Sequence, residues 1–195
     1  METLDVIKAR RSVRKFKEDS VPKAILEEVL DAARWAPSAH NSQPWKFVVV
    51  ENPLKDKIAD TLRNTADRMP DRVTKAEMWR ASKMVKQAPV LITVWSNRIM
   101  SSKLESSSDE ANFRITRTYE IQSVAAAIQN VLLAAQELGL GTVWIGVVLF
   151  VEDKIKELCR AQNELMAIIP IGYPASQPTQ PPKRKELTEI VSYLK

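Results

Sequence analysis

Ten residues between two regular patterns carry most of the side chains that could bind a ligand. Residues 36–45 read APSAHNSQPW. Pro37 and Pro44 each disfavour helical geometry at the preceding residue, so the segment is predicted to be a stiff loop. A polar loop between rigid elements can be a binding site, but it can equally be a plain helix-to-strand connection. Its polar side chains are Ser38, His40, Asn41, Ser42 and Gln43.

A second polar group lies near the start of the chain. Residues 10–17 read RRSVRKFK, in which Arg10, Ser12 and Arg14 alternate. Alternate side chains of an extended segment point the same way. Two guanidinium groups beside a hydroxyl can receive a phosphate or a carboxylate, because arginine forms paired hydrogen bonds to such groups. The other interpretation is a solvated basic segment.

Scarce residue types exclude several kinds of site. With one histidine and one cysteine, the chain cannot form a zinc site from Cys and His ligands. For the same reason an iron–sulfur cluster ligated by cysteines cannot form within one chain. All four glycines follow residue 138, which excludes a phosphate-binding glycine loop in an N-terminal βαβ unit. A bound phosphate must therefore be held by side chains. His40 is interpreted as a polar loop residue, and Cys159, without a neighbouring base, is not expected to be a catalytic thiol.

The composition is that of one globular domain spanning residues 1–195, with 45% apolar and 27% charged residues. No apolar run reaches the length of a membrane span, and the acidic start lacks a signal-peptide core. Together with the single cysteine, these features favour the cytoplasm and no membrane partner. The net charge of +5 suits an anionic ligand. Acidic residues are interspersed outside residues 8–17 and 183–185, so nucleic-acid binding is ranked last.

The elements that must position these loops follow from apolar spacing. Helical spacing predicts helices over residues 3–10, 22–35, 53–67, 72–87 and 151–162. Apolar runs predict strands over residues 47–50, 90–95, 142–148 and 165–171, and a short final strand over 189–193. The first two of these runs are continuous, which favours strands buried on both faces.

The longest helical pattern covers residues 121–138 and has no charge between Glu120 and Glu137. A helix without a charged face is expected to be surrounded by protein, so it is predicted to be central, within the domain or at a subunit interface. Residues 97–118 lose the pattern, which favours a mobile lid or an insertion at a surface opening. Residues 176–185 are rich in proline and are predicted to be extended.

Four segments, taken together and in order, resemble the FMN-dependent nitroreductase family. They are RRSVR at 10–14, PSAHNSQPW at 37–45, the pattern over 124–146 that ends LGLGTVWIG, and PKRKEL at 182–187. The resemblance covers nearly the whole chain. It implies an α+β fold whose central sheet is mixed but mainly antiparallel, flanked by helices. It also implies an intertwined homodimer with two FMN molecules at its interface and a C-terminal extension, around 176–195, that reaches over the partner.

The resemblance also implies which residues bind the cofactor. Arg10, Ser12 and Arg184 would hold the FMN phosphate, and Arg14 would lie nearer the ribityl chain and the pyrimidine edge. Ile145 and Gly146 would lie beside the flavin ring, with a backbone N–H near N5; many family members carry Glu where Ile145 stands. The remaining implied residues are Arg11, Asn64 at the pyrimidine edge, Ser38, Ala39 and Asn41 reaching the partner's flavin, and Gln43 fixing their loop.

The implied activity is an FMN-dependent oxidoreductase that uses NAD(P)H to reduce nitroaromatics, quinones or related small-molecule acceptors in a ping-pong cycle. The flavin carries hydride at N5, so the protein supplies no catalytic acid–base pair. The alternatives are a specialised flavin enzyme of the same fold, of the flavin-fragmenting or reductive dehalogenase type, and a non-catalytic flavin-binding protein. The sequence leaves open the physiological acceptor and the choice between NADH and NADPH.

Overall fold

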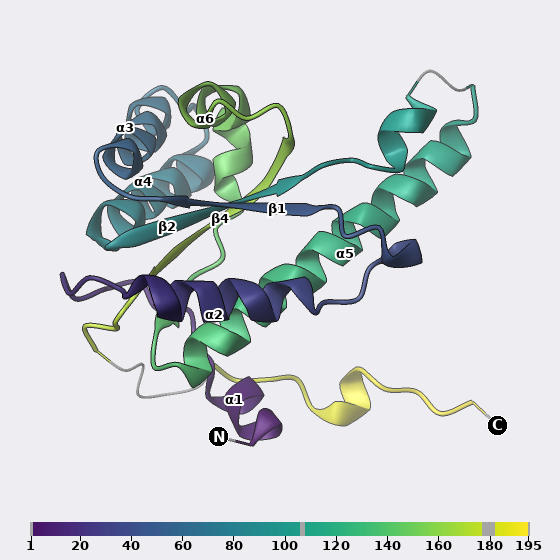
Figure 1. Cartoon of the computed structure of the whole chain (residues 1–195), viewed down its shortest axis with the longest axis horizontal. Coiled ribbons are helices and arrows are strands. Elements are labelled where there is room, and N and C mark those ends of the chain that lie inside the picture. Colours follow the sequence, from purple (N-terminus) through teal and green to yellow (C-terminus); the bar gives the residue numbers. More distant parts are fainter. Residues whose placement is uncertain (1, 106–107, 177–181, 195) are drawn as a thin grey trace.

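The computed structural model describes residues 2–105, 108–176 and 182–194, and its centre is a four-stranded sheet (Figure 1). The strand order is β1-β2-β4-β3, and every neighbouring pair is antiparallel. The mainly antiparallel sheet that was expected is therefore confirmed. The strands are β1 (Trp45–Val50), β2 (Val90–Ser96), β3 (Gly141–Thr142) and β4 (Glu164–Gly172).

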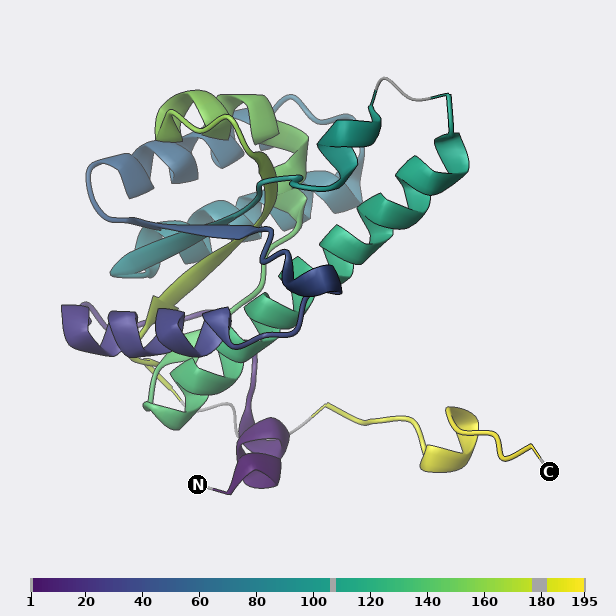
Figure 2. The same cartoon turned by 45° about the vertical axis from the view of Figure 1, so that its right-hand side comes forward.

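Helices cover both faces of the sheet and give the α+β architecture three layers (Figures 1 and 2). One face is covered by α3 (Leu54–Ala66), α4 (Arg72–Gln87) and α6 (Glu152–Cys159), and the other by α2 (Lys23–Arg34) and α5 (Glu110–Glu137). The core is accordingly split into two apolar clusters, one on each side of the sheet. The helices predicted over 22–35, 53–67 and 72–87 are confirmed.

β1 and β2 differ in burial, although their sequences predicted that both are buried on both faces. Every residue of β2 is buried, because β1 and β4 flank it and helices cover both faces. The prediction that β1 is buried on both faces is wrong: Val49 is 40% exposed. β1 is an edge strand with a single neighbour, and an apolar run alone does not reveal an edge.

The N-terminal segment joins the sheet after α1 (Thr3–Ala9). Ser12 pairs with Thr142 in parallel orientation, and the Val13 N–H donates to the Thr142 carbonyl at 2.9 Å. A Cβ added to Gly141 would lie 2.7 Å from the Val13 side chain. Glycine is therefore required for the segment to lie this close to β3.

The long helix α5 starts much earlier than the predicted residue 121. It begins at Glu110, and the Asp109 side chain accepts from the Asn112 N–H at 2.9 Å, as an N-cap does. The second half of the predicted lid or insertion over 97–118 is therefore helical. Its first half contains a short 3₁₀ helix, η2 (Ser101–Leu104). The first turns of α5 project past the sheet (Figure 1), so they show little apolar periodicity.

Three further boundaries differ from the predictions. The strand expected over 142–148 is only β3; the chain then makes an isolated pairing at Ile145 and enters the 3₁₀ helix η3 (Val147–Val151). The final strand expected over 189–193 is wrong, because those residues follow a 3₁₀ turn, η4 (Leu187–Glu189), and are exposed. Residues 177–181 of the expected extended segment lie outside the described residues. Among the described residues, no helix has the length and apolar character to cross a membrane.

Candidate functional site

A hollow of about 200 Å³ opens between α4 and the turn that follows β3. Two guanidinium groups, of Arg14 and Arg80, reach it from different elements. Its volume is below the range of about 300–1,000 Å³ that encloses a whole small ligand, so it can hold only part of one. Its lining consists of Arg14, Glu77, Arg80, Ala81, Met84 and residues 143–147.

The turn over 144–146 presents backbone to this hollow. The Ile145 N–H donates to the Ile168 carbonyl at 3.0 Å, and its side chain is only 5% exposed. The N–H of Gly146, in contrast, has no acceptor within the part of the chain that the structure describes. A Cβ added to Gly146 would meet nothing within 4 Å, so space is open beside it. The backbone N–H expected near a flavin ring is therefore available from Gly146 and not from Ile145.

Arg10, in the segment that leads to Ser12 and Arg14, holds an unsatisfied donor. Its Nε is buried and has no hydrogen-bond partner among the described residues. Buried N–H groups are rarely left unpaired, so this atom calls for a ligand or a partner group. Arg11 differs, because its Nη1 donates to the carbonyls of Lys8 at 2.6 Å and of Arg10 at 2.8 Å. The Arg11 guanidinium thus caps the end of α1. Arg14 Nη1 makes one such contact, with the Ser12 carbonyl at 3.3 Å, and Arg10, Ser12 and Arg14 stay the predicted anion-binding set.

The polar loop over 36–45 is strained and firmly held. His40, Asn41 and Gln43 have φ angles of 53°, 51° and 45°, which non-glycine residues seldom adopt. The Gln43 N–H donates to Ser38 Oγ at 3.0 Å, and the Gln43 side chain donates to the Asn41 carbonyl at 3.3 Å. The Ala39 N–H donates to Ser123 Oγ of α5 at 3.3 Å. Strain that the surroundings maintain in this way is concentrated at functional sites.

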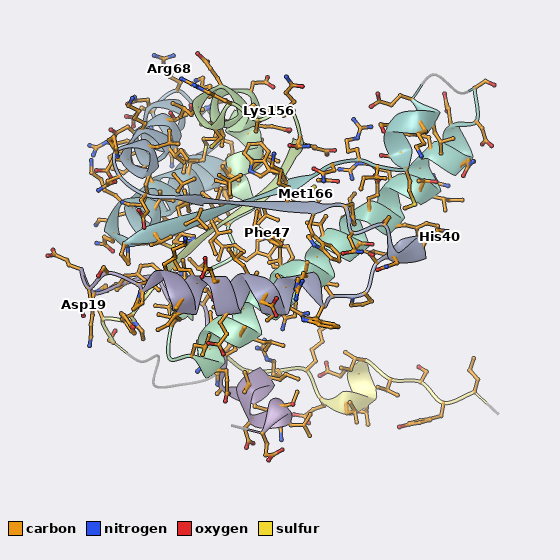
Figure 3. All side chains as sticks on the ribbon, viewed as in Figure 1. Asp19, His40, Phe47, Arg68, Lys156 and Met166 are labelled. Atoms are coloured by element: carbon orange, nitrogen blue, oxygen red, sulfur yellow. The ribbon has the colours of Figure 1, made fainter. Side chains whose placement is uncertain are left out.

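The loop and the hollow occupy different places in one chain. Ser38 and Ala39 line a shallow depression of about 200 Å³ against Tyr119, Gln122 and Ser123 of α5. This depression shares no residue with the hollow. Figure 3 shows His40 at the far end of the molecule from Arg68 and Lys156, which belong to the α3–α6 side. A single chain therefore brings the candidate residues together as two separate groups.

Comparison with known proteins identifies the family of this chain. The model of the "Nitroreductase family" matches residues 7–173, which is most of the chain. The chain belongs to the nitroreductase family. It is therefore a flavin oxidoreductase of that family, and the family predicted from the four segments is confirmed.

Two relatives are similar to this chain over most of their lengths. A Methanothermobacter thermautotrophicus protein named "Putative NADH dehydrogenase/NAD(P)H nitroreductase" is 35% identical over 91% of this chain and 80% of its own. The iodotyrosine deiodinase of Thermotoga neapolitana is 30% identical over 97% of both chains.

Two solved structures share the fold. The first is a BluB-like flavoprotein from Clostridium difficile 630, with a TM-score of 0.79, 30% identity and full coverage of both chains. The second is a nitroreductase-type protein from Desulfovibrio desulfuricans in complex with FMN, with a TM-score of 0.74 and 25% identity. It covers all of this chain and 98% of that one.

Two residues that the nitroreductase resemblance assigned to the site do not line the hollow of their own chain. Asn64 is exposed on α3 and does not line the hollow. Arg184 is exposed on the segment 182–194, which extends away from the body (Figures 1 and 2). The side chains that do line the hollow from the helical layer were missed. They share one face of α4 at helical spacing, a signal present in the sequence, and are Glu77, Arg80, Ala81 and Met84.

Neither a reactive thiol nor a metal site is indicated among the described residues. Burial raises the pKa of the Cys159 thiol, and a hydrogen bond with the Thr93 side chain offsets this only in part. Thiolate, the reactive form, is therefore scarce at neutral pH. No group of three or more His, Cys, Asp or Glu residues within the described ranges is arranged to hold a metal ion.

Proposed function

We propose that this chain is an FMN-dependent NAD(P)H oxidoreductase that works as a homodimer and reduces nitroaromatics, quinones or related small molecules. The observation that carries the proposal is the group formed by the unpaired Arg10 Nε, Ser12, Arg14 and the free Gly146 N–H. It combines an anion-binding set with an exposed backbone donor at an open hollow. The FMN in a solved structure of similar fold supports the same assignment.

The residues present fit this cofactor. Arg10 and Ser12 would bind the phosphate, with Arg184 reaching it from the C-terminal segment. Arg14 would lie toward the ribityl chain and the pyrimidine edge, where its positive charge stabilises negative charge on the reduced ring. The Gly146 N–H would donate to a ring nitrogen, and Trp144, 41% exposed, would flank the ring. When bound, the flavin supplies the hydride chemistry at N5.

The two separate groups of residues support a dimer. The hollow is too small for a whole ligand, and the 38–43 loop lies apart from it. We infer that Ser38, Ala39 and Asn41 complete the site of the partner subunit, with Gln43 fixing their loop. A charge-free stretch of α5 exposes Ile121 (43%), and such a face favours burial by a second copy. The C-terminal segment also exposes large apolar side chains, which are Leu187, Ile190, Tyr193 and Leu194.

A second candidate function is reductive dehalogenation. The specific observation behind it is the iodotyrosine deiodinase that is similar over 97% of both chains. Both candidates use the same cofactor and differ in the acceptor that enters the dimer. The single cysteine fits a reducing compartment, and on that ground we place the protein in the cytoplasm.

The test starts from the purified protein. We expect a flavin absorption spectrum, and release of FMN on acid denaturation identified by chromatography. NADH or NADPH oxidation is then followed with menadione, a nitroaromatic and 3-iodotyrosine as separate acceptors. Turnover with the first two supports the leading proposal, and iodide release from the third supports the second. A colourless protein that FMN does not reconstitute would overturn both.

A further inference from the structure

Most of the net positive charge of the chain lies in two neighbouring helices beside the hollow. Between Arg63 and Gln87 there are seven basic and three acidic residues, a net charge of +4, while the whole chain carries +5. All seven are at least partly exposed, and six are fully so. We call five of them the α4 basic face: Arg63, Arg72, Lys75, Lys83 and Lys86.

The spacing places these charges on one surface. Arg72, Lys75, Lys83 and Lys86 recur at intervals that keep them on one side of α4. From Arg72 to Lys86 the helix rises about 21 Å. Arg63 of α3 joins them, because its guanidinium lies over the Trp79 ring at 4.5 Å from the centroid. The face is thus long, continuous and exposed.

Contacts within the protein hold the face in position. The Trp79 indole N–H donates to Asp67 Oδ1 at 3.0 Å, which fixes the ring on which Arg63 stacks. Asp71 accepts from the Thr74 N–H at the start of α4, which lowers the pKa of that carboxyl. Ordered side chains lose less conformational entropy when a partner binds. Asp67 and Asp71 thus make contacts within the two helices. Asp60 of α3 lies 3.5 Å from Lys86 Nζ, so this one charge of the face is partly balanced and the net charge of the face stays positive.

Arg80 connects this face to the hollow. It lies on α4 beside Lys83 in the helical projection and also lines the hollow. A partner bound to the α4 basic face would therefore lie next to the bound flavin. The face is longer than one phosphate contact requires. It matches the small, charge-steered interfaces of electron-transfer complexes, which bury less than about 1,200 Å².

We propose that the α4 basic face docks an acidic electron-carrier protein, which delivers electrons to the flavin as a second donor beside NAD(P)H. The proposal rests on the flavin site proposed above. Two carrier molecules, each oxidised by one electron, supply the two electrons of one flavin reduction, and one proton from solvent completes the anionic reduced ring. Opposite charge on the two proteins accelerates their encounter, and salt weakens it.

The test compares two charge-reversal pairs in the flavin-loaded protein. Arg72→Glu with Lys83→Glu alters the face, and Lys23→Glu with Lys103→Glu changes the net charge equally at exposed sites elsewhere. Flavin bleaching is followed anaerobically after mixing with a small acidic [2Fe–2S] ferredoxin, reduced and freed of excess dithionite. We expect the first pair to slow bleaching at least about tenfold at low salt and the second less than about twofold. Reduction by NADH should be unchanged in both.

A binding measurement separates this proposal from the flavin assignment. Oxidised ferredoxin is titrated into flavin-free protein in a calorimeter, with salt-sensitive binding expected for the wild type and lost in the Arg72/Lys83 pair. A protein that takes up no FMN yet binds the carrier would refute the proposed function alone. Equal bleaching rates in both pairs, or ferredoxin that does not bind, would overturn the docking proposal. The docking proposal would also be overturned if a DNA oligonucleotide bound to this face in a salt-sensitive manner and prevented ferredoxin from binding.

Discussion

Glu120, fully buried in α5, accepts a hydrogen bond from the main-chain N–H of Met100 at 2.8 Å. The same carboxylate accepts from the Ser101 N–H at 3.3 Å and from its hydroxyl. Segment 97–104 is thereby fixed to the helix by one buried side chain. Arg98 and Arg117 strengthen the attachment through ion pairs with Glu164 at the start of β4.

Replacing this carboxylate should release the segment. In Glu120→Ala two main-chain donors lose their acceptor, and roughly 2–4 kcal/mol of unfolding free energy should be lost. Urea unfolding measures the loss, and limited proteolysis should show new cleavage within 97–105. Glu120→Gln keeps one acceptor oxygen and should lose less. Equal stability of the alanine variant and the wild type would show that the contacts are not needed.

Gly141 should control the position of the anion-binding segment. In Gly141→Ala the new methyl group meets Val13, so the segment carrying Arg10, Ser12 and Arg14 must shift. We expect a loss of about 1–3 kcal/mol in stability and weaker FMN retention. Adding Val13→Ala removes two of the three close atoms and should recover part of both. No recovery in the double variant would indicate that this close contact is not the cause.

Arg10 and Arg11 are neighbours of the same type with different predicted effects. Arg10→Ala removes an unpaired donor, and the Kd of FMN should rise about ten- to a hundredfold, corresponding to about 1.5–3 kcal/mol for a charged hydrogen bond. Arg11→Ala removes contacts to the carbonyls of Lys8 and Arg10 and should affect FMN much less. Fluorescence titration of the flavin-free variants measures both constants. The reverse order would contradict the assignment.

A composite site predicts complementation between two defective variants. Arg10→Ala and Asn41→Ala each damage a different half of the proposed site, so each homodimer should lose FMN. In a mixed dimer one of the two sites has both halves intact. Random reassociation should therefore restore about a quarter of the wild-type FMN content. Flavin content after co-refolding of the two chains gives the answer, and a mixture as empty as its components would place both groups in one subunit.

Cys159 should make the unfolding free energy decrease as the pH rises into the alkaline range. The thiol titrates near 9.0 when unfolded, and burial raises its pKa in the folded protein. A raised pKa means that the folded state binds the proton more tightly, so this stabilisation is complete below 9.0 and is lost as the pH rises through the folded value. Thermal unfolding between pH 7 and 10.5 should show a decline that is shallower in Cys159→Ala. Parallel curves would assign the decline to other groups.

Periodicity predicted the parts of the fold that pack against the sheet. Leu26, Val29 and Ala33 define the buried side of α2, and the all-apolar run of β2 is fully buried. The errors lie where packing is absent. The first turns of α5 project past the core, and Val49 faces out from an edge strand.

The residues of the candidate site were also predicted where a local motif marks them and missed where only packing brings them to the hollow. Of the residues predicted from local motifs, Arg14 and Gly146 line one hollow, and Ser12 pairs with β3 beside it because a short segment runs along that strand. Arg80 was not identified, since its place at the hollow depends on how α4 packs against the turn after β3. Asn64 is exposed on α3 and does not line the hollow. The sequence shows which residues share a face of α4, but it does not show which surface that face packs against.

One turn of α5 connects two loops that are far apart in the sequence. Glu120 holds the segment around Met100, and Ser123 holds the strained loop at Ala39. The Asn97 N–H also donates to the Pro44 carbonyl at 2.7 Å, which links the two loops directly. The loops are therefore mechanically coupled through one helical turn and one direct hydrogen bond, so a displacement of either loop is expected to be transmitted to the other.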